Sequence, residues 1–565
     1  MPSVLTSTSP PPKPAGLSAD LRKASALVVD GSPTTRMTLA GQLRTMGLTS
    51  VGQAGKIAEA RRELERHTFD VVVCGDEFPK EGGTGQELLD DLRRSGLLPY
   101  ATVFVMLTNE ATYLKVAEAA ESSVDSYLVR PYSAGTLYDR IEQARLRKAA
   151  LYDIYQALDN ERYDDAVTMC RQRLAQQGPQ WLQAARLGAE ILLRLERCGE
   201  AQKLFEQIHE ADPKPWALLG VARAQLDGGS AHAAQDTLRA LIEEEPDYPD
   251  AYDVLGRVQM ELGHFQAALE NLEKAVELTP MAIGRQQRLG MLAYFCGNRE
   301  KARELLERST YLGLDSKMFD SECLVLLGLS AFEHEQPAQL ERHLGELRKR
   351  LRQNPHDTRL QRFNDNIAVL SYLQQNHREK AQNLANALCA PIGEPDFDME
   401  AACNLLTMLS LAYRRGLVVQ QDLAVVERLG RRFATTKAMG DLLASAASAH
   451  TAYADILRSS QDDMVQLIER SLRTANQGDP QSAVNDLMRV AEATLNARAV
   501  ESAWLVLQRY QAQLPQSERW IDRMGELRQH YGTARNKPAL GDRRLRPAGG
   551  VNLGPMDRPR TPDNT

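Results

Sequence analysis

The sequence predicts an α/β domain, a (βα)5 doubly wound sheet, followed by an all-α solenoid built from helical repeats. Three observations lead to this prediction. Up to about residue 146, short apolar runs alternate with amphipathic stretches, which is typical of parallel strands joined by helices. After residue 148 the short apolar runs stop and a period near 34 residues begins. Aromatic residues make up only 6% of the chain, which favours a mostly helical protein.

Each element of the N-terminal domain is expected from its own run of residues. Strands are expected at residues 26–29, near 51, and at 71–74, 103–107 and 127–129. Amphipathic helices are expected between and after them, at residues 34–46, 56–66, 86–94, 111–120 and 134–147. In a sheet of this kind the functional crevice lies at the carboxyl ends of the strands.

The next segment, residues 149–314, repeats one pair of helices. A Leu-Gly pair recurs in the first helix, an alanine recurs in the second, and prolines end three of the units. Glycine and alanine let two helices approach closely, and proline cannot continue a helix. The repeated positions are Gly188, Gly220, Gly256 and Gly290, then Ala166, Ala201, Ala234, Ala268 and Ala302, and finally Pro213, Pro246 and Pro280. The pattern resembles the tetratricopeptide (TPR) repeat, best at residues 252–280, and the resemblance implies a groove that binds proteins or peptides.

The remainder of the chain divides into three parts. Residues 315–531 keep helix-turn-helix spacing while the repeat consensus fades, which indicates diverged helical repeats. Residues 1–20 and 532–565 differ in composition from the rest and are predicted to be disordered. The C-terminal tail is rich in proline and carries seven Lys and Arg residues against three aspartates. It is either a solvated tail or a segment that docks on an acidic partner.

Charge and composition exclude several classes of function. The 68 Lys and Arg residues against 75 Asp and Glu give a net charge of −7, which does not favour nucleic-acid binding. No run of about 18 apolar residues occurs, and the first residues lack the pattern of a secretory signal, so we expect a cytoplasmic protein without membrane insertion. The seven cysteines and ten histidines show no catalytic or metal-binding spacing. We therefore expect neither an enzyme nor a bound cofactor.

Four segments of the N-terminal domain resemble the receiver domain of response regulators in bacterial two-component systems. They read LVVDGSP at 27–33, FDVVVCGDEFP at 69–79, VMLTNE at 105–110 and DSYLVRPY at 125–132. The resemblance implies the five-stranded doubly wound fold predicted above. It also implies a pocket in which an acidic pair after the first strand holds Mg²⁺ beside a phosphate-accepting aspartate after the third.

Three positions of this pocket depart from that chemistry. The acidic pair reads Asp30 and Gly31, so one metal ligand is missing. The spacing from Asp70 and from Pro79 places the acceptor position at Gly75, which has no side chain to phosphorylate. The family's lysine after the fifth strand is matched by Arg130, which keeps the charge but changes its shape.

Other features of the receiver pocket are retained. Thr108 matches the switch hydroxyl of receivers, and Tyr127 matches the switch aromatic. Arg130-Pro131 stands where receivers carry a cis Lys-Pro peptide, so the resemblance implies a cis bond here. A pseudo-receiver that works without phosphate is the first interpretation.

A second interpretation keeps phosphorylation. A one-residue bulge at Gly75 would bring Asp76 to the acceptor place. Asp30 and Asp76 would then be the Mg²⁺ ligands, with Glu77 as a further candidate, whereas the first interpretation needs no Mg²⁺.

The sequence therefore predicts a two-component-type signal-transduction protein that acts as a scaffold. We expect other signalling proteins to bind the receiver face and a groove lined by the first helices of the repeats. The alternative is a phosphorylatable response regulator of a phosphorelay, with TPR output. The groove candidates are polar residues outside the repeating packed positions: Arg223, Arg257, Gln259 and Arg288.

Overall fold

The computed structural model describes residues 21–78, 83–109, 124–316, 318–514 and 517–533. The helix expected at residues 111–120 lies outside this range. So do the N-terminal segment 1–20 and, from residue 534, the C-terminal tail, for which disorder is predicted. The described residues divide into two compact units, 21–254 and 255–533. No helix within the described residues is long and apolar enough to cross a membrane.

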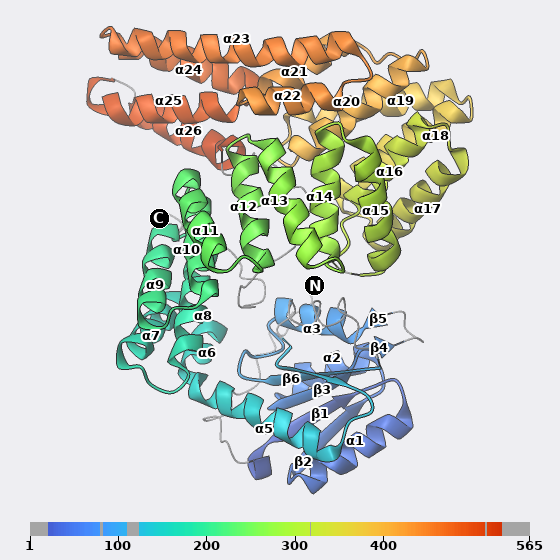
Figure 1. The fold of residues 1–565 in the computed structure, drawn as a ribbon, viewed down its shortest axis with the longest axis vertical. Coiled ribbons are helices and arrows are strands. Elements are labelled where there is room, and N and C mark those ends of the chain that lie inside the picture. Colours follow the sequence, from blue (N-terminus) through green and yellow to red (C-terminus); the bar gives the residue numbers. More distant parts are fainter. Residues whose placement is uncertain (1–20, 79–82, 110–123, 317, 515–516, 534–565) are drawn as a thin grey trace, which may run out of the picture. The chain divides into compact units, whose positions relative to one another are not determined.

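A five-stranded parallel sheet forms the centre of the N-terminal domain, which confirms the predicted fold class (Figure 1). Its strand order is β2-β1-β3-β6-β7. β3 and β6 are buried along their whole length, which explains their continuous apolar runs. The strands are β1 (Ser25–Val29), β2 (Ser50–Ala54), β3 (Val71–Gly75), β6 (Val103–Thr108) and β7 (Ser126–Val129).

Helices cover both faces of this sheet (Figure 1). On one face, α1 and α5 pack on a cluster that includes Leu43 and Ile141; on the other, α2 and α3 pack on a cluster that includes Leu64 and Leu89. The N-terminal domain also contains a short antiparallel pair, β4 with β5, which the sequence did not predict. The bounds are η1 (Leu21–Lys23), α1 (Pro33–Thr45), α2 (Ile57–Arg66), β4 (Glu77–Phe78), β5 (Gly83–Thr84), α3 (Gly85–Arg94) and α5 (Ala134–Ala150).

The last helix of the sheet domain leads directly into the first repeat, with Leu151 alone between α5 and α6. Near this junction the ammonium of Lys148 is buried; it donates hydrogen bonds to the carbonyl oxygens of Tyr100 at 2.7 Å and Thr102 at 2.6 Å. The same group pairs with Asp125 at 2.9 Å. Burial lowers the pKa of Lys148 to about 8, and the Asp125 carboxylate opposes this shift.

Aromatic contacts extend the junction from the sheet domain into α6. The rings of Tyr100 and Tyr155 stack with centroids 6.5 Å apart, and the Asp159 carboxylate accepts a hydrogen bond from the Tyr100 backbone N–H at 3.0 Å. Tyr100 thereby joins the apolar core of the first repeats. These repeats contain α6 (Tyr152–Asp159), α7 (Tyr163–Gln176), α8 (Trp181–Arg194), α9 (Cys198–Ala211), α10 (Pro215–Asp227) and α11 (Ala231–Glu244).

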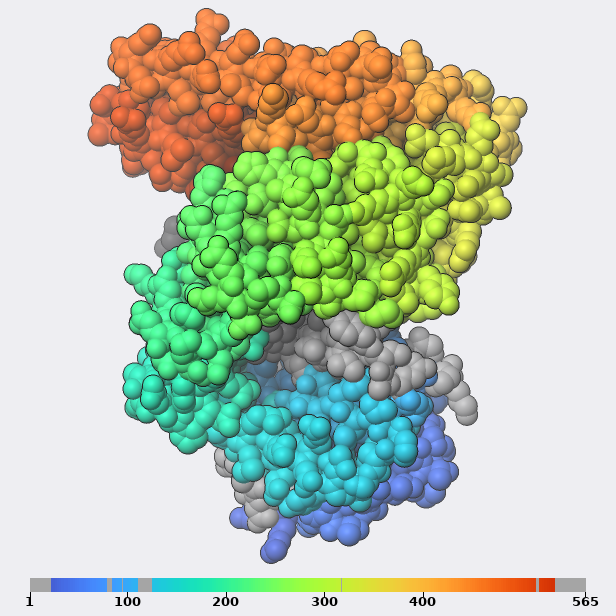
Figure 2. Space-filling model, viewed as in Figure 1, coloured from blue at the N-terminus to red at the C-terminus, as the bar shows by residue number. Residues whose placement is uncertain are grey.

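The second unit is entirely helical in its described residues, and its helices form a continuous surface from green to red in Figure 2. α12 (Pro249–Glu261) contains the division between the two units. The following helices are α13 (Phe265–Leu278), α14 (Ile283–Phe295), α15 (Arg299–Gly313), α16 (Glu322–Glu333), α17 (Pro337–Gln353), α18 (Thr358–Gln374), α19 (Arg378–Leu388) and η2 (Ala390–Gly393). The last are α20 (Met399–Arg414), α21 (Asp422–Phe433), α22 (Lys437–Ala446), α23 (Thr451–Asn476), α24 (Pro480–Thr494), α25 (Ala497–Tyr510), η3 (Gln511–Gln513) and α26 (Ser517–Tyr531).

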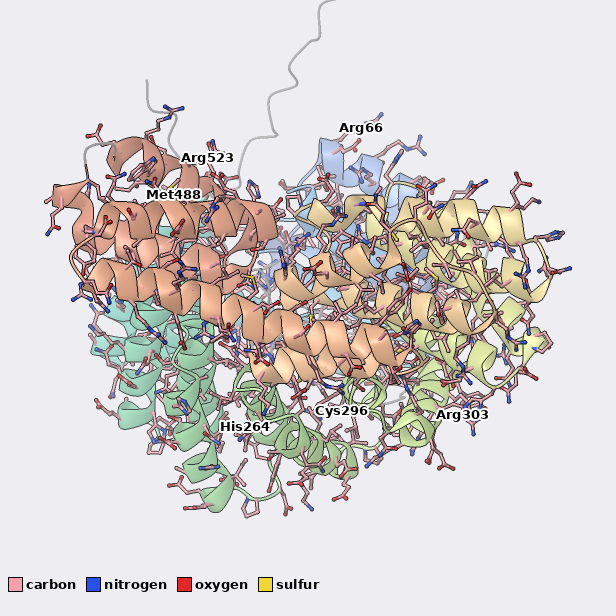
Figure 3. All side chains as sticks on the ribbon, turned by 90° about the horizontal axis from the view of Figure 1, so that it is seen from above. Arg66, His264, Cys296, Arg303, Met488 and Arg523 are labelled. Carbon is pink, nitrogen blue, oxygen red and sulfur yellow. The ribbon has the colours of Figure 1, made fainter. Side chains whose placement is uncertain are left out.

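The 26-residue helix α23 belongs to two apolar cores of this unit. Its N-terminal part, with Tyr453 and Leu457, packs in the core that also contains residues of α13 to α22. Its C-terminal part, with Met464 and Ile468, packs with α24, α25 and α26. Met488, among these last helices in Figure 3, is 8% exposed and belongs to the second core.

The glycines of the first helices pack against second-helix side chains, as the small-residue pattern indicates. A Cβ atom added at Gly220 would lie 2.4 Å from the Phe205 ring, and one added at Gly256 would lie 2.8 Å from Leu272. Distances this short force the neighbouring side chain to move. The recurring glycine is therefore a steric requirement of the helix crossing.

Replacing Gly220 by alanine should lower the free energy of unfolding by roughly 1–3 kcal/mol, because the new methyl group overlaps the Phe205 ring. Gly199→Ala, in α9, is the matched control: no atom lies within 4 Å of its added Cβ. That variant should be neutral or more stable by up to about 1 kcal/mol. Thermal melting of both variants measures the difference. Identical melting of the Gly220 variant and the parent would contradict the assigned crossing.

A buried ionic cluster connects α16, α18 and α20. Arg359 donates two hydrogen bonds to the Glu400 carboxylate, from Nε to Oε1 at 2.8 Å and from Nη2 to Oε2 at 2.7 Å. Glu322 is fully buried and accepts a hydrogen bond from Asn404 at 2.9 Å, while its other carboxyl oxygen has no hydrogen-bond partner. Burial, and then the neighbouring charge of Glu400, raise the pKa of Glu322 well above its ordinary value of 4.5.

We expect Glu322→Gln to stabilise the protein increasingly as the pH rises. The folded chain holds the Glu322 proton at pH values where the unfolded chain releases it, so the parent loses stability above about pH 4.5. Glutamine does not titrate, so the melting temperature of the variant should exceed that of the parent more at pH 8 than at pH 5.

Glu304→Gln, at an exposed glutamate of α15, is the control and should show almost no difference at either pH. A Glu322 variant that is less stable than the parent at pH 8 would show that the ionised carboxylate is required.

Candidate functional site

The candidate site lies at the carboxyl end of the parallel sheet, where receiver-pocket positions from four strands meet. Asp30 follows β1, Gly75 ends β3, Thr108 ends β6, and Arg130 follows β7. Parallel strands bring these positions to one edge because all of them run in the same direction. Tyr127 lies within β7, half-buried, and packs against the core under α2 and α3.

Asp30 is held by groups of the protein itself. Its Oδ2 accepts a hydrogen bond from Arg130 Nη2 at 2.7 Å, and its Oδ1 accepts one from the Ser32 backbone N–H at 2.8 Å. Arg36 donates to the Asp30 carbonyl oxygen at 2.6 Å. The Asp30 side chain is only 8% exposed, so its negative charge is balanced mainly by the Arg130 guanidinium.

Gly75 occupies the place that faces this carboxylate. A Cβ atom added at Gly75 would lie 2.8 Å from Asp30 Oδ2. The strand pairing continues in register through Gly75, opposite Leu107, so the bulge considered from the sequence does not form. A side chain at position 75 would point at Asp30, and Asp30 would have to move to make room for it.

Asp76 continues the backbone hydrogen bonding of β3 and does not take the acceptor position of Gly75. Its backbone N–H donates to the Leu107 carbonyl oxygen at 2.9 Å, and its own carbonyl oxygen accepts from the Gly85 N–H at 2.7 Å. Its buried carboxylate accepts a hydrogen bond from the Thr108 hydroxyl at 3.3 Å. The structure thus places Asp76 beside the switch hydroxyl. Glu77, the further carboxylate considered from the sequence, is exposed on β4.

The pocket does not fit a magnesium ion. Mg²⁺ requires several oxygen ligands in octahedral geometry, and Gly31 and Gly75 supply no carboxylate. Asp30 is already paired with Arg130. Among the described residues, no group of three or more His, Cys, Asp and Glu side chains is placed to hold a metal ion.

Two features of the site were not recognised in the sequence. The β4-β5 hairpin begins directly after Asp76 and ends at Thr84, the N-cap of α3. Thr84 and Glu87 form a capping box, and this spacing is a signal that could have located the helix start. The second feature is the hydrogen bond from Arg36 to the Asp30 carbonyl oxygen, which no local sequence pattern indicates.

The Arg130-Pro131 bond is cis, which confirms the sequence prediction.

The side chains predicted for the partner groove lie largely inside the protein. Arg223 and Arg288 are each 4% exposed and Gln259 is 3% exposed, whereas Arg257 is half-buried. Arg223, Arg288 and Gln259 are thus packed inside the protein, contrary to the expectation that they line an open groove. Arg223 forms two hydrogen bonds with Glu190, at 2.8 and 3.1 Å, one repeat away along the chain. Such a pair balances the two buried charges.

Comparison with known families agrees with this architecture. The family model described as response regulator receiver domain matches residues 26–142, and that of the tetratricopeptide repeat matches residues 249–280. Chemotaxis protein CheY of Pseudomonas aeruginosa is 33% identical over 117 residues, which are 21% of this chain and 92% of that protein. Chemotaxis protein CheY-3 of Vibrio cholerae is 32% identical over 117 residues, 21% of this chain and 88% of that protein.

Two solved structures are similar to parts of the chain. Vibrio cholerae chemotaxis protein CheY4 has 26% identity and a TM-score of 0.20, covering 21% of this chain and 98% of its own. A thermophilic TPR protein of Thermus thermophilus has 24% identity and a TM-score of 0.26, covering 32% of this chain and 95% of its own.

The metal-binding deficit can be tested by restoring both missing carboxylates. The variant Gly31→Asp with Gly75→Asp should melt below the parent without Mg²⁺, because it adds negative charge beside Asp30. Millimolar Mg²⁺ should raise its melting temperature, since an ion that binds the folded state stabilises it. The parent should respond to Mg²⁺ hardly at all. A clear rise of the parent's melting temperature with Mg²⁺ would show that the pocket binds the ion after all.

Proposed function

The chain belongs to the response regulator receiver family through residues 26–142, and we propose that it is a signalling scaffold whose receiver works without phosphorylation. A receiver joined to TPR repeats makes it a two-component-type signalling protein with a protein-interaction region. The observation that supports phosphate independence is the pairing of Asp30 with Arg130 beside a glycine at the acceptor position.

Phosphoryl transfer depends on positioned charges, and this pocket lacks several of them. The acceptor position has no side chain, and the acidic pair has lost one carboxylate. In phosphoryl transfer the metal and the basic side chain neutralise the charge of the moving group. Here Arg130 neutralises Asp30 instead. The charge of Asp30 is thus balanced without Mg²⁺ and without a phosphoryl group, and we infer that the pocket uses no cofactor.

The contact between Thr108 and Asp76 supports a receiver held in one state. By resemblance to the family, the switch hydroxyl responds to an acceptor group that gains a phosphoryl group. In this chain Thr108 donates a hydrogen bond to the carboxyl group of Asp76, a side chain of the protein itself. The hydroxyl thereby has a partner within the protein that needs no kinase. The receiver would then offer one constant face to its partner proteins.

The repeat region would supply the second binding surface of the scaffold. Helical repeats present long surfaces to protein partners. The net charge of −7 gives no general attraction to nucleic acid, and the chemistry of the described residues suggests no enzyme site. We propose binding to other signalling proteins in the cytoplasm, without nucleic-acid binding, membrane insertion or catalysis.

The second candidate function is a phosphorylatable response regulator with Asp76 as acceptor and TPR output. It is favoured by one observation, the placement of Asp76 next to Thr108. It requires Asp30 to leave Arg130 and bind Mg²⁺ together with Asp76.

Incubation with Mg²⁺ and a small-molecule phosphodonor should leave the intact mass of the protein unchanged, because position 75 offers no acceptor. A phosphorylatable receiver treated in parallel serves as the positive control. Gain of one phosphoryl mass by the parent, lost in Asp76→Asn, would refute phosphate independence and establish the second candidate. The scaffold role is tested by partner capture with the full chain, which should be equal with and without the phosphodonor.

A further inference from the structure

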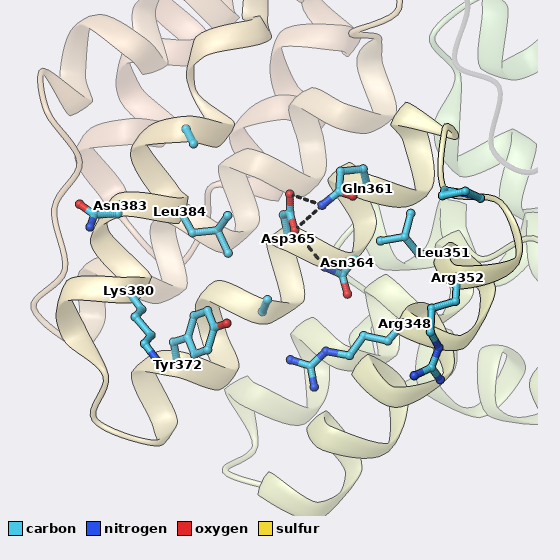
Figure 4. A pocket seen from close by; sticks show the side chains of 13 residues that line it. Arg348, Leu351, Arg352, Gln361, Asn364, Asp365, Tyr372, Lys380, Asn383 and Leu384 are labelled. Atoms are coloured by element: carbon cyan, nitrogen blue, oxygen red, sulfur yellow. Dashed lines mark hydrogen bonds between the residues drawn. The ribbon is translucent and has the colours of Figure 1, made fainter.

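A groove of about 860 Å³ opens between α17 and α19 of the helical unit, over α18 (Figure 4). Its floor comes from α18, through residues such as Asp365 and Tyr372. One wall comes from α17, through Arg348 and Arg352, and the other comes from α19, through Lys380. The groove is separate from the surface considered above, because its three helices lie outside residues 149–314.

The charge of the groove is strongly positive. Arg348, Arg352 and Lys380 are exposed, and none of them has an ion pair or hydrogen bond with a described residue. The lining contains one carboxylate, Asp365, which accepts hydrogen bonds from the amides of Gln361 and Asn364. The charge of Asp365 is therefore partly satisfied within the floor. The three cations are available to an anionic ligand.

The floor also offers an apolar surface and a hydrogen-bond acceptor. Leu351, Tyr372 and Leu384 are half-buried beside Ala368, and the Lys380 ammonium lies 5.9 Å from the centre of the Tyr372 ring. Asn364 Oδ1 is buried and has no hydrogen-bond partner among the described residues. A buried carbonyl oxygen without a partner is costly, and a peptide N–H would satisfy it once the Asn364 side chain turns toward the groove.

We propose that this groove binds an acidic peptide segment of a partner protein, one that alternates carboxylates with apolar side chains. The carboxylates would pair with the cations of the two walls, and the apolar side chains would contact the floor between them. The chain's own tail, residues 532–565, carries seven basic residues against three aspartates and is repelled by the same cations. The proposed occupant is therefore an acidic segment of a separate protein and not this tail.

The test uses the full chain and a fluorescein-labelled peptide in which glutamates alternate with leucines, with binding measured by fluorescence anisotropy. Charge reversal at Arg348→Glu with Arg352→Glu should weaken binding by about tenfold or more, and added salt should weaken binding to the parent. The matched control is Arg342→Glu with Lys349→Glu, which makes the same change of charge on the same helix outside the groove lining. This control should retain the affinity of the parent.

Lys380→Glu, on the opposite wall, is an independent variant and should also weaken binding. The proposal would be overturned by no binding by the parent, by equal weakening by the two double variants, or by equal binding of a peptide with lysines in place of glutamates. Displacement of the acidic peptide by a single-stranded oligonucleotide that itself requires Arg348 and Arg352 would assign the groove to nucleic acid and likewise overturn it.

Discussion

The buried ammonium of Lys148 is the interaction on which the first unit depends. It stands where the sheet domain ends and the repeats begin, and it is held by two carbonyl oxygens and the Asp125 carboxylate. A buried lysine without such partners would be strongly destabilising, so the sheet edge and the end of α5 have to stay in register. Because one residue separates α5 from α6, the same contacts orient the first repeat on the sheet domain.

This junction lies at the opposite end of the sheet from the receiver pocket. Thr102 precedes β6 and Asp125 precedes β7, whereas Thr108 ends β6 and Arg130 follows β7. The two strands that carry pocket residues at their carboxyl ends therefore carry the contacts of Lys148 at their amino ends. These two strands are hydrogen-bonded to each other.

Charged residues of the helical repeats are either structural or available for binding, according to their burial. Arg223 and Glu190 satisfy each other inside the first unit, and Arg359 does the same for Glu400 inside the second. These charges pair between neighbouring helices, and none of the four side chains is more than 16% exposed. Arg348 and Arg352 have the same chemistry at the rim of an open groove. Exposure, and not residue type, separates the structural arginines from those available for binding.

The sequence by itself determined the features that depend on local periodicity. The apolar runs located all five strands of the sheet, and the small residues at repeat spacing located the close helix crossings, such as Gly220 against Phe205. Spacing within the family motifs also located Gly75 and the cis bond before Pro131. These properties are fixed by neighbours along the chain or by the strict geometry of a parallel sheet.

Only the tertiary structure decided which polar groups form hydrogen bonds with each other and which are buried. The partner of Asp76 is Thr108, 32 residues away, and the partner of Arg223 is Glu190, 33 residues away. The physical reason is that hydrogen bonds and burial are set by long-range packing, which a period in the sequence does not encode.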